Sequence, residues 1–116
     1  MGRRGDIVRS YMSAYGGGDH AGVAALLAEE VSWVVYGHTT FTGREAYLAE
    51  MRRAEEGGLP TVIADRYLEE GDAVFASGRV RAPLPGGGEV DLVFADVFTF
   101  EGDLIVRVES YLVPAG

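Results

Sequence analysis

The chain has 116 residues, 47% of them hydrophobic, and a formal net charge of −8 at pH 7. This length is enough for one domain with a buried core, 1–116, but short for two. The acidic charge argues against nucleic acid as a partner, because phosphate binding needs a basic patch. No apolar run approaches the ~20 residues that span a bilayer, and the basic start lacks the apolar segment of a signal peptide. We therefore expect no membrane partner and a cytoplasmic location.

Several residue types are missing, and their absence removes particular kinds of chemistry. The chain has no Cys, which excludes disulfides and thiolate nucleophiles. It has no Lys, because all 10 basic residues are Arg, and this excludes Schiff-base catalysis. Its two histidines, His20 and His38, show no metal-ligand spacing. We therefore expect neither a metal nor a cofactor.

Three helices are predicted in the first half of the chain, at 5–15, 19–30 and 43–54. The first has apolar residues at helical spacing and stops at a run of three glycines. Asp19 is the expected N-cap of the second, which should end at the acidic pair Glu29 and Glu30. Thr42 and Glu45 have the spacing of a capping box at the start of the third.

Five strands are predicted, one between the second and third helices and four after them. β-branched and aromatic residues mark the first, and a loop at 37–41 follows it. Short glycine-bearing turns join the later four, and such turns connect antiparallel neighbours. This order predicts an α+β fold in which three N-terminal helices pack on the concave face of a curved antiparallel sheet, forming a cone whose mouth is a small-molecule pocket. The strand ranges are 31–36, 61–69, 73–82, 89–100 and 104–113.

The predicted strand 89–100 carries one carboxylate on an otherwise apolar face. Side chains alternate between the two faces of a strand, so Asp96 shares its face with Phe94 and Phe98. A carboxylate in that position is costly unless it is hydrogen-bonded, neutralised or beside a cavity. Either a bulge turns Asp96 to solvent, or the sheet curves around a pocket that contains it.

The opposite face of the same strand is also largely apolar. It carries Val93, Ala95 and Val97, which should point away from the helices. An apolar patch that a monomer would leave exposed is often a protein–protein interface. We therefore expect a homodimer that associates through the sheet.

Several short motifs, taken in order and spacing, resemble one protein family. They are YMSAY at 11–15, GD at 18–19, LLAEE at 26–30, GREA at 43–46, DVFTF at 96–100 and IVRV at 105–108. Together they span nearly the whole chain and are similar to the nuclear transport factor 2-like superfamily, in particular to its SnoaL-like and ketosteroid isomerase-like branch. The resemblance implies a cone-shaped fold with a small apolar molecule as its ligand.

The resemblance assigns roles to two polar residues and leaves a third role unfilled. Tyr11 stands where the steroid isomerases keep their oxyanion-hole tyrosine. Asp96 stands where they keep an aspartic acid that remains neutral and donates a second hydrogen bond to the oxyanion. Their general base is a carboxylate late in the first strand, and Val35 occupies that position here. SnoaL-like proteins also often end the last strand with Tyr-x-Asp, where this chain has Val113. The match therefore implies an oxyanion hole without an obvious base.

The other candidate site residues each have a structural alternative. His38 is the best substitute base by residue type, because histidines titrate near neutrality, but it can equally be an exposed loop residue. Tyr15 fits a core role better than a catalytic one. Trp33 either floors the pocket or packs in the core. The residues expected to contact the ligand are Tyr15, Trp33, Val35, Met51, Phe94 and Phe98.

Three functions are compatible with these residues. The first is an isomerase, cyclase or related lyase that acts on a small apolar carbonyl compound, with Tyr11 and Asp96 on an enolate-like oxygen and His38 as the base. The second is a non-catalytic module that holds a hydrophobic ligand in the same cavity, and Val35 favours it over the first. The third is a dimeric scaffold with a filled cavity, which two polar groups on an apolar lining disfavour. The substrate class rests on analogy with the family.

Overall fold

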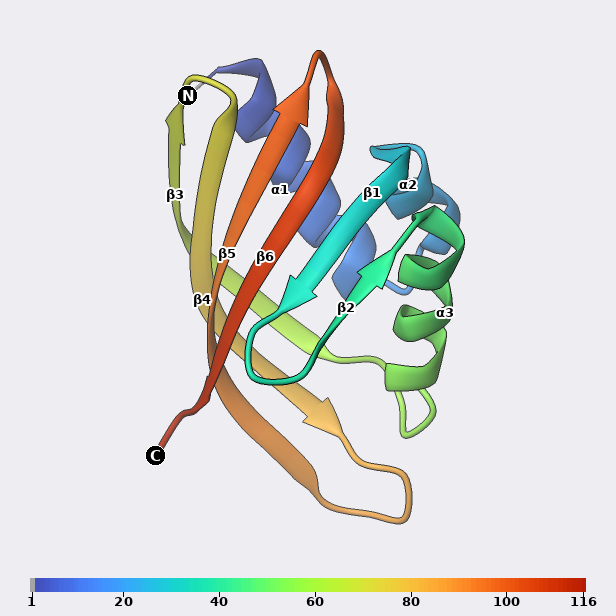
Figure 1. Cartoon of the computed structure of the whole chain (residues 1–116). Helices are drawn as coiled ribbons and strands as arrows, with labels where there is room; N and C mark the ends of the chain where they lie inside the picture. The colour runs from blue at the N-terminus through green and yellow to red at the C-terminus, as the bar shows by residue number, and fades with distance from the viewer. Residues whose placement is uncertain (1) are drawn as a thin grey trace.

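The computed structural model describes residues 2–116. Six strands form one curved sheet, and three helices pack against it (Figure 1). The helices are α1 (Arg3–Gly16), α2 (His20–Ala24) and α3 (Arg44–Ala54). The strands are β1 (Leu27–Val35), β2 (Thr39–Thr42), β3 (Thr61–Glu70), β4 (Ala73–Pro83), β5 (Glu89–Glu101) and β6 (Leu104–Pro114). The predicted α+β class is confirmed. Within residues 2–116, no helix is long and apolar enough to cross a membrane.

The sheet is mixed, which corrects the antiparallel sheet expected from the sequence. Its order is β2-β1-β6-β5-β4-β3. The pairs β3–β4, β4–β5 and β5–β6 are the predicted antiparallel hairpins, whereas β1 and β6 run parallel. The parallel pair joins the first and last strands of the chain. Local turn signals predict only neighbouring pairs, so they carry no information about this one.

Irregular pairing and one glycine bend the sheet. The register of β3 with β4 shifts between Ala64 and Arg66, and Gly78 lies opposite Ala64. A Cβ atom at Gly78 would lie 1.9 Å from the carbonyl oxygen of Ile63, so the two backbones approach as only glycine allows. Figure 1 shows α1 lying across the hollow side of the curve. α1 contacts β3 and β4, while α3 contacts β1 and β2.

The predicted second helix is too long. Asp19 caps α2 as expected, because its side chain accepts the backbone N–H of Gly22 at 2.9 Å. The helix ends at Ala24, however, and β1 begins at Leu27. Leu27 is fully buried and pairs with Ile105 of β6. Tertiary burial of an apolar residue thus overrides the helical propensity of this segment.

The segment before α3 also differs from its prediction. Residues 39–42 form the short edge strand β2, which pairs with β1, where a loop was expected. The capping box is not formed, because Thr42 belongs to that strand and Gly43 is the N-cap residue of α3. Among residues 2–116, no side chain forms a capping hydrogen bond at this end of α3. The predicted extent of α3 is nevertheless close to the observed Arg44–Ala54.

β5 carries the alternation expected for its two faces. Its register with β4 is unbroken from Glu89 to Thr99, so no bulge turns Asp96 outward. Phe94 and Phe98 are buried in the core on the hollow side of the sheet. On the opposite face Val93 is 38% exposed.

Candidate functional site

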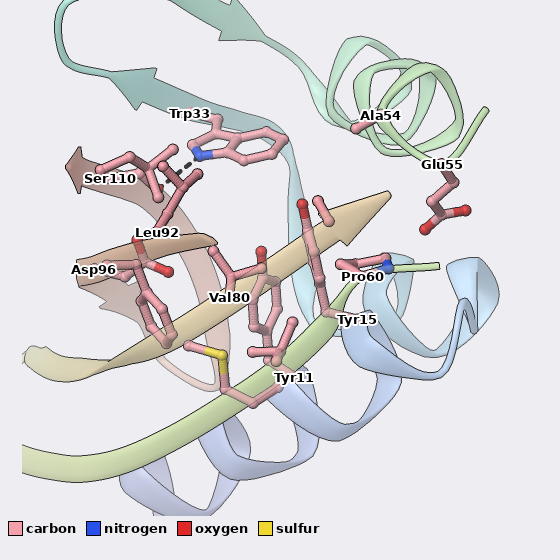
Figure 2. Close-up of a pocket in the computed structure, with 15 residues that line it drawn as sticks. Tyr11, Tyr15, Trp33, Ala54, Glu55, Pro60, Val80, Leu92, Asp96 and Ser110 are labelled. Carbon is pink, nitrogen blue, oxygen red and sulfur yellow. Dashed lines mark hydrogen bonds between the residues drawn. The ribbon is translucent and has the colours of Figure 1, made fainter. Parts of the chain in front are cut away.

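A cavity of about 170 Å³ opens between the hollow face of the sheet, α1 and the end of α3. In Figure 2 the carboxyl group of Asp96 and the hydroxyls of Tyr11 and Tyr15 project toward this space, with Trp33 along one side. Most of the lining is apolar or aromatic, as is typical of small-molecule sites. The lining residues are Tyr11, Met12, Tyr15, Trp33, Ala54, Glu55, Pro60, Val62, Val80, Ala82, Leu92, Phe94, Asp96, Ser110 and Leu112.

Asp96 is the acidic residue that β5 contributes to this lining. Burial raises the pKa of Asp96 from its ordinary 3.8 to about 7, because the apolar surroundings disfavour the charged form. The hydroxyl of Ser110 opposes this rise in pKa, because it hydrogen-bonds to the charged form. Ser110 lies directly opposite Asp96 in the β5–β6 pair. Near neutral pH, Asp96 is therefore poised between a neutral donor and a carboxylate.

Ser110 also links Asp96 to Trp33. The indole Nε1–H of Trp33 donates to Ser110 Oγ at 2.9 Å, and both side chains are buried. Since Ser110 accepts that bond, its own proton remains available to Asp96. Ser110 was not among the residues predicted from the sequence, although a serine on the inward face of β6, between Val108 and Leu112, is a signal of a polar group on an apolar face.

Tyr11 is 3% exposed, and its hydroxyl shares a hydrogen bond with the hydroxyl of Tyr47. Burial raises the pKa of both tyrosines well above the ordinary 10, so both keep their protons at neutral pH. Tyr47 comes from α3, is fully buried, and stacks on Trp33 with ring centroids 4.3 Å apart. When Tyr47 donates to Tyr11, the proton of Tyr11 is free to point into the cavity. Tyr47 was not among the site residues predicted from the sequence.

No hydrogen bond joins Tyr11 to Asp96 among residues 2–116. Both line the same cavity, and the charge of Asp96 is one of the factors that raise the pKa of Tyr11, after burial and the neighbouring tyrosines. The two groups therefore lie near each other, and neither uses the other as a hydrogen-bond partner. A ligand oxygen between them can accept a hydrogen bond from each.

A second acidic residue, Glu55, lines the cavity on the other side of Tyr15 from Asp96 (Figure 2). Glu55 Oε1 bonds to His20 Nε2 at 2.7 Å. Burial raises the pKa of the intervening Tyr15, and the charges of Asp96 and Glu55 add to the rise. Glu55 was not predicted from the sequence either, because a charged residue at a helix end ordinarily faces solvent.

The structure brings only some of the predicted site residues together. Besides Tyr11 and Asp96, the predicted residues Tyr15, Trp33 and Phe94 line the cavity. Phe98 and Met51 are fully buried in the core beside it, and Val35 packs against the same core without lining the cavity. His38 is exposed in the turn between β1 and β2, with its ring 6.2 Å from that of Phe41, and does not line the cavity. Within residues 2–116 no group of three or more His, Asp or Glu side chains is arranged to hold a metal.

The family model of the SnoaL-like domain matches residues 8–108. The chain belongs to the SnoaL-like domain family. No curated protein matches it. Solved structures of NTF2-like and ketosteroid isomerase-like proteins share its fold, and the predicted family and cone fold are thereby confirmed.

Three of these structures illustrate the likeness. An NTF2-like protein of unknown function from Burkholderia pseudomallei is 26% identical, covers 97% of this chain and 92% of its own, and has a TM-score of 0.87. Bal32a, from a soil-derived mobile gene cassette, is 25% identical over 94% of this chain and 88% of its own, with a TM-score of 0.87. A protein of ketosteroid isomerase-like fold from Catenulispora acidiphila, crystallised with trimethylamine, is 20% identical over 91% of this chain and 84% of its own, with a TM-score of 0.83.

Proposed function

We propose that this SnoaL-like protein binds a small, largely apolar carbonyl compound and stabilises negative charge on its oxygen with Tyr11 and Asp96, as an isomerase or cyclase would. The observation that carries the proposal is that both groups line one cavity without a hydrogen bond between them. Each donor aimed at a developing oxyanion in a dry site is worth on the order of 3 kcal/mol. The match to the SnoaL-like family and the likeness of the fold to a ketosteroid isomerase-like protein support this choice of chemistry.

The chemistry at the oxygen is that of an enolate. When a carbon next to the carbonyl loses its proton, the electron pair of the broken C–H bond moves through the carbon–carbon bond to the oxygen. Tyr11 and a protonated Asp96 would each donate a hydrogen bond to that oxygen. Burial keeps Tyr11 protonated and holds the pKa of Asp96 at about 7, which makes Asp96 a donor at neutral and lower pH.

The second candidate function is a ligand-binding module without catalysis. It is favoured by Val35, since valine at the family's base position accepts no proton. His38, the substitute base predicted from the sequence, is exposed and lies outside the cavity lining, so it is not placed to take a proton from a ligand in the cavity. A scaffold with a filled interior has the least support, because the cavity holds about 170 Å³ of space.

The proposal extends to a homodimer formed through the outer face of the sheet. Val93 and Val113 are paired across β5 and β6, and Tyr111 lies beside them opposite Ala95. Val93 is 38%, Tyr111 46% and Val113 55% exposed. Together these side chains form a continuous apolar patch of the kind that copies of a chain bury against one another.

Binding of a fluorescent phenol, 2-naphthol, compared with its methyl ether tests the oxygen site. A cavity of 150 Å³ holds benzene, so one ring fits the interior of about 170 Å³ and the second extends toward the mouth. Charge-assisted hydrogen bonds are about twice as strong as neutral ones, so we expect the phenol to bind at least about tenfold more tightly. Tyr11→Phe and Asp96→Leu should each remove most of that preference and leave ether binding nearly unchanged.

The matched control is Asp96→Asn, whose amide is always neutral and always a donor. It should keep the preference of the wild type and keep it at high pH as well. In the wild type the preference should fade as the pH rises through about 7, because Asp96 then ionises and ceases to donate. Equal binding of phenol and ether, or a preference that survives both Tyr11→Phe and Asp96→Leu, would contradict the proposal.

A further inference from the structure

Glu55 presents a buried carboxylate oxygen that the protein itself does not satisfy. Its side chain is 13% exposed, and Oε1 is held by His20 Nε2 at 2.7 Å. Oε2 is buried, and no donor from residues 2–116 reaches it. Buried polar atoms are nearly always hydrogen-bonded, and a charged one left without a partner costs free energy. The arrangement therefore fixes one oxygen and leaves the other to a group from outside the chain.

This carboxylate does not stabilise the helix that carries it. Glu55 is the C-cap residue of α3, at the end where the helix dipole disfavours negative charge. The last turn of α3 carries two basic residues, Arg52 and Arg53, and Arg53 pairs with Glu50 at 2.6 Å rather than with Glu55. Glu55 thus lowers the stability of the fold in two ways. Its buried Oε2 has no hydrogen-bond partner within residues 2–116, and its charge lies at the unfavourable end of the helix dipole.

The surroundings of Glu55 indicate the charge of a ligand group that would bind to it. Among the residues that the structure describes, the cavity lining contains two acidic side chains, Glu55 and Asp96, and no basic one. The whole chain carries a net charge of −8, which attracts cations. The aromatic ring of Tyr15 lies between the two acids in Figure 2, and ring faces also favour cations. An anionic ligand finds no counter-charge in this lining.

We propose that Glu55 binds a protonated amine on the ligand, with His20 as the positioning residue that holds the carboxylate. The inference rests on the proposed function, because the same ligand would place its oxygen against Tyr11 and Asp96 at the other end of the cavity. The ligand class is therefore an apolar, ring-sized compound with a carbonyl or phenolic oxygen at one end and an ammonium group at the other. The ammonium donates to Glu55 Oε2 in a charge-assisted hydrogen bond.

The test uses a series of phenols that each carry an alkyl chain. The chains differ in length, and for each length three compounds are made that differ only in the group at the end of the chain. The forms end in an amine, in a hydroxyl or in a methyl group, and binding is measured at pH 6, where the amine and Asp96 are both protonated. For the chain length that fits best, the amine should bind at least about tenfold more tightly than the methyl form. Glu55→Gln should remove that preference, while Glu56→Gln, which removes the same charge from the next and exposed residue, should keep it.

The outcomes separate this inference from the function on which it rests. Tyr11→Phe should weaken the amine and methyl forms by the same factor, since it acts only on their shared oxygen end. If Tyr11→Phe has no effect but Glu55→Gln removes the amine preference, the amine site stands and the oxygen site fails. An amine that binds no better than the methyl form, or a preference that survives Glu55→Gln, overturns the amine site. A hydroxyl form that binds as tightly as the amine overturns the assignment of a cation.

Discussion

Replacing Asp96 by Asn should make the protein more stable at alkaline pH and leave it nearly unchanged at acidic pH. In the folded protein burial holds the pKa of Asp96 at about 7, against an ordinary value of 3.8 in the unfolded chain. The unfolded state therefore releases the proton first as the pH rises. Between pH 4 and 7 the unfolded state is progressively favoured, and above pH 7 the loss of stability is complete.

The size of the effect follows from the difference between the two pKa values. That difference is about 3 units, and each unit corresponds to 1.36 kcal/mol, so Asp96 destabilises the native state by about 4 kcal/mol above pH 7. Asn has nearly the same shape, stays neutral and can still bond to Ser110. Asp96→Asn should therefore gain up to about 4 kcal/mol relative to the wild type at pH 8 and less than about 1 kcal/mol at pH 4.

Urea unfolding at a series of pH values measures this difference directly. The wild-type curve contains the titration of every group, but the difference between the two proteins isolates Asp96. Asp91→Asn is the control, because Asp91 lies on the same strand but is exposed and pairs with Arg79. If the stabilities of Asp96→Asn and the wild type run parallel from pH 4 to 8, Asp96 titrates as an ordinary surface carboxyl and the argument from burial is refuted. Asp96→Leu should likewise fold and gain stability at alkaline pH, by a smaller amount, because Ser110 then loses a partner.

Two further predictions concern the sheet. Sedimentation at micromolar concentration should give about twice the chain mass of 12.4 kDa. Val113→Arg should lower the measured mass toward that of the monomer, whereas Leu104→Arg, at an exposed residue beside the β5–β6 turn, should leave it unchanged. A wild-type protein that sediments as a monomer would contradict the proposed interface. Gly78→Ala should lower the free energy of unfolding by roughly 1–3 kcal/mol, because its Cβ would meet the Ile63 carbonyl oxygen at 1.9 Å. A Cβ atom at Gly16 would lie 3.7 Å from its nearest neighbour, so Gly16→Ala should be neutral or stabilising when both variants are unfolded in urea. If Gly78→Ala and Gly16→Ala change the stability equally, the close approach at Gly78 is not the cause.

The parts of the fold that local patterns determine were predictable, and the parts that distant segments determine were not. Helical spacing and glycine turns predicted α1, α3 and the hairpins from β3 to β6. The parallel contact of β1 with β6 depends on two strands at opposite ends of the chain. That contact also draws Leu27 out of the predicted second helix, so one missed pairing explains two errors.

The same division holds within the candidate site. Alternation on β5 places Asp96 and Phe94 on one face, and the family resemblance adds Tyr11. Ser110 and Glu55 matter only through contacts across the fold, to Trp33 and to His20 respectively. A serine on a strand and a glutamate at a helix end are ordinary in sequence, and their burial becomes evident only once the sheet has curved over them.

Ser110→Ala provides a test of how the cavity sets the titration of Asp96. The Ser110 hydroxyl favours the charged carboxylate and so holds the pKa of Asp96 lower than burial alone would. Without it the pKa of Asp96 should rise above about 7, and the preference for 2-naphthol over its methyl ether should persist to correspondingly higher pH. The variant should also lose roughly 1–3 kcal/mol of stability, because the buried Nε1–H of Trp33 loses its acceptor.

The midpoint of the pH profile separates a tuning role from a merely structural one. A loosened cavity would weaken naphthol binding at every pH and leave the midpoint where it is. Loss of the donor to Asp96 moves the midpoint upward, whatever happens to the affinity at low pH. Ser77→Ala is the matched control, since Ser77 pairs with Ala95 and does not line the cavity, and it should change neither quantity. A midpoint that stays at its wild-type value in Ser110→Ala would mean that Ser110 serves Trp33 alone and that burial by itself sets the pKa of Asp96.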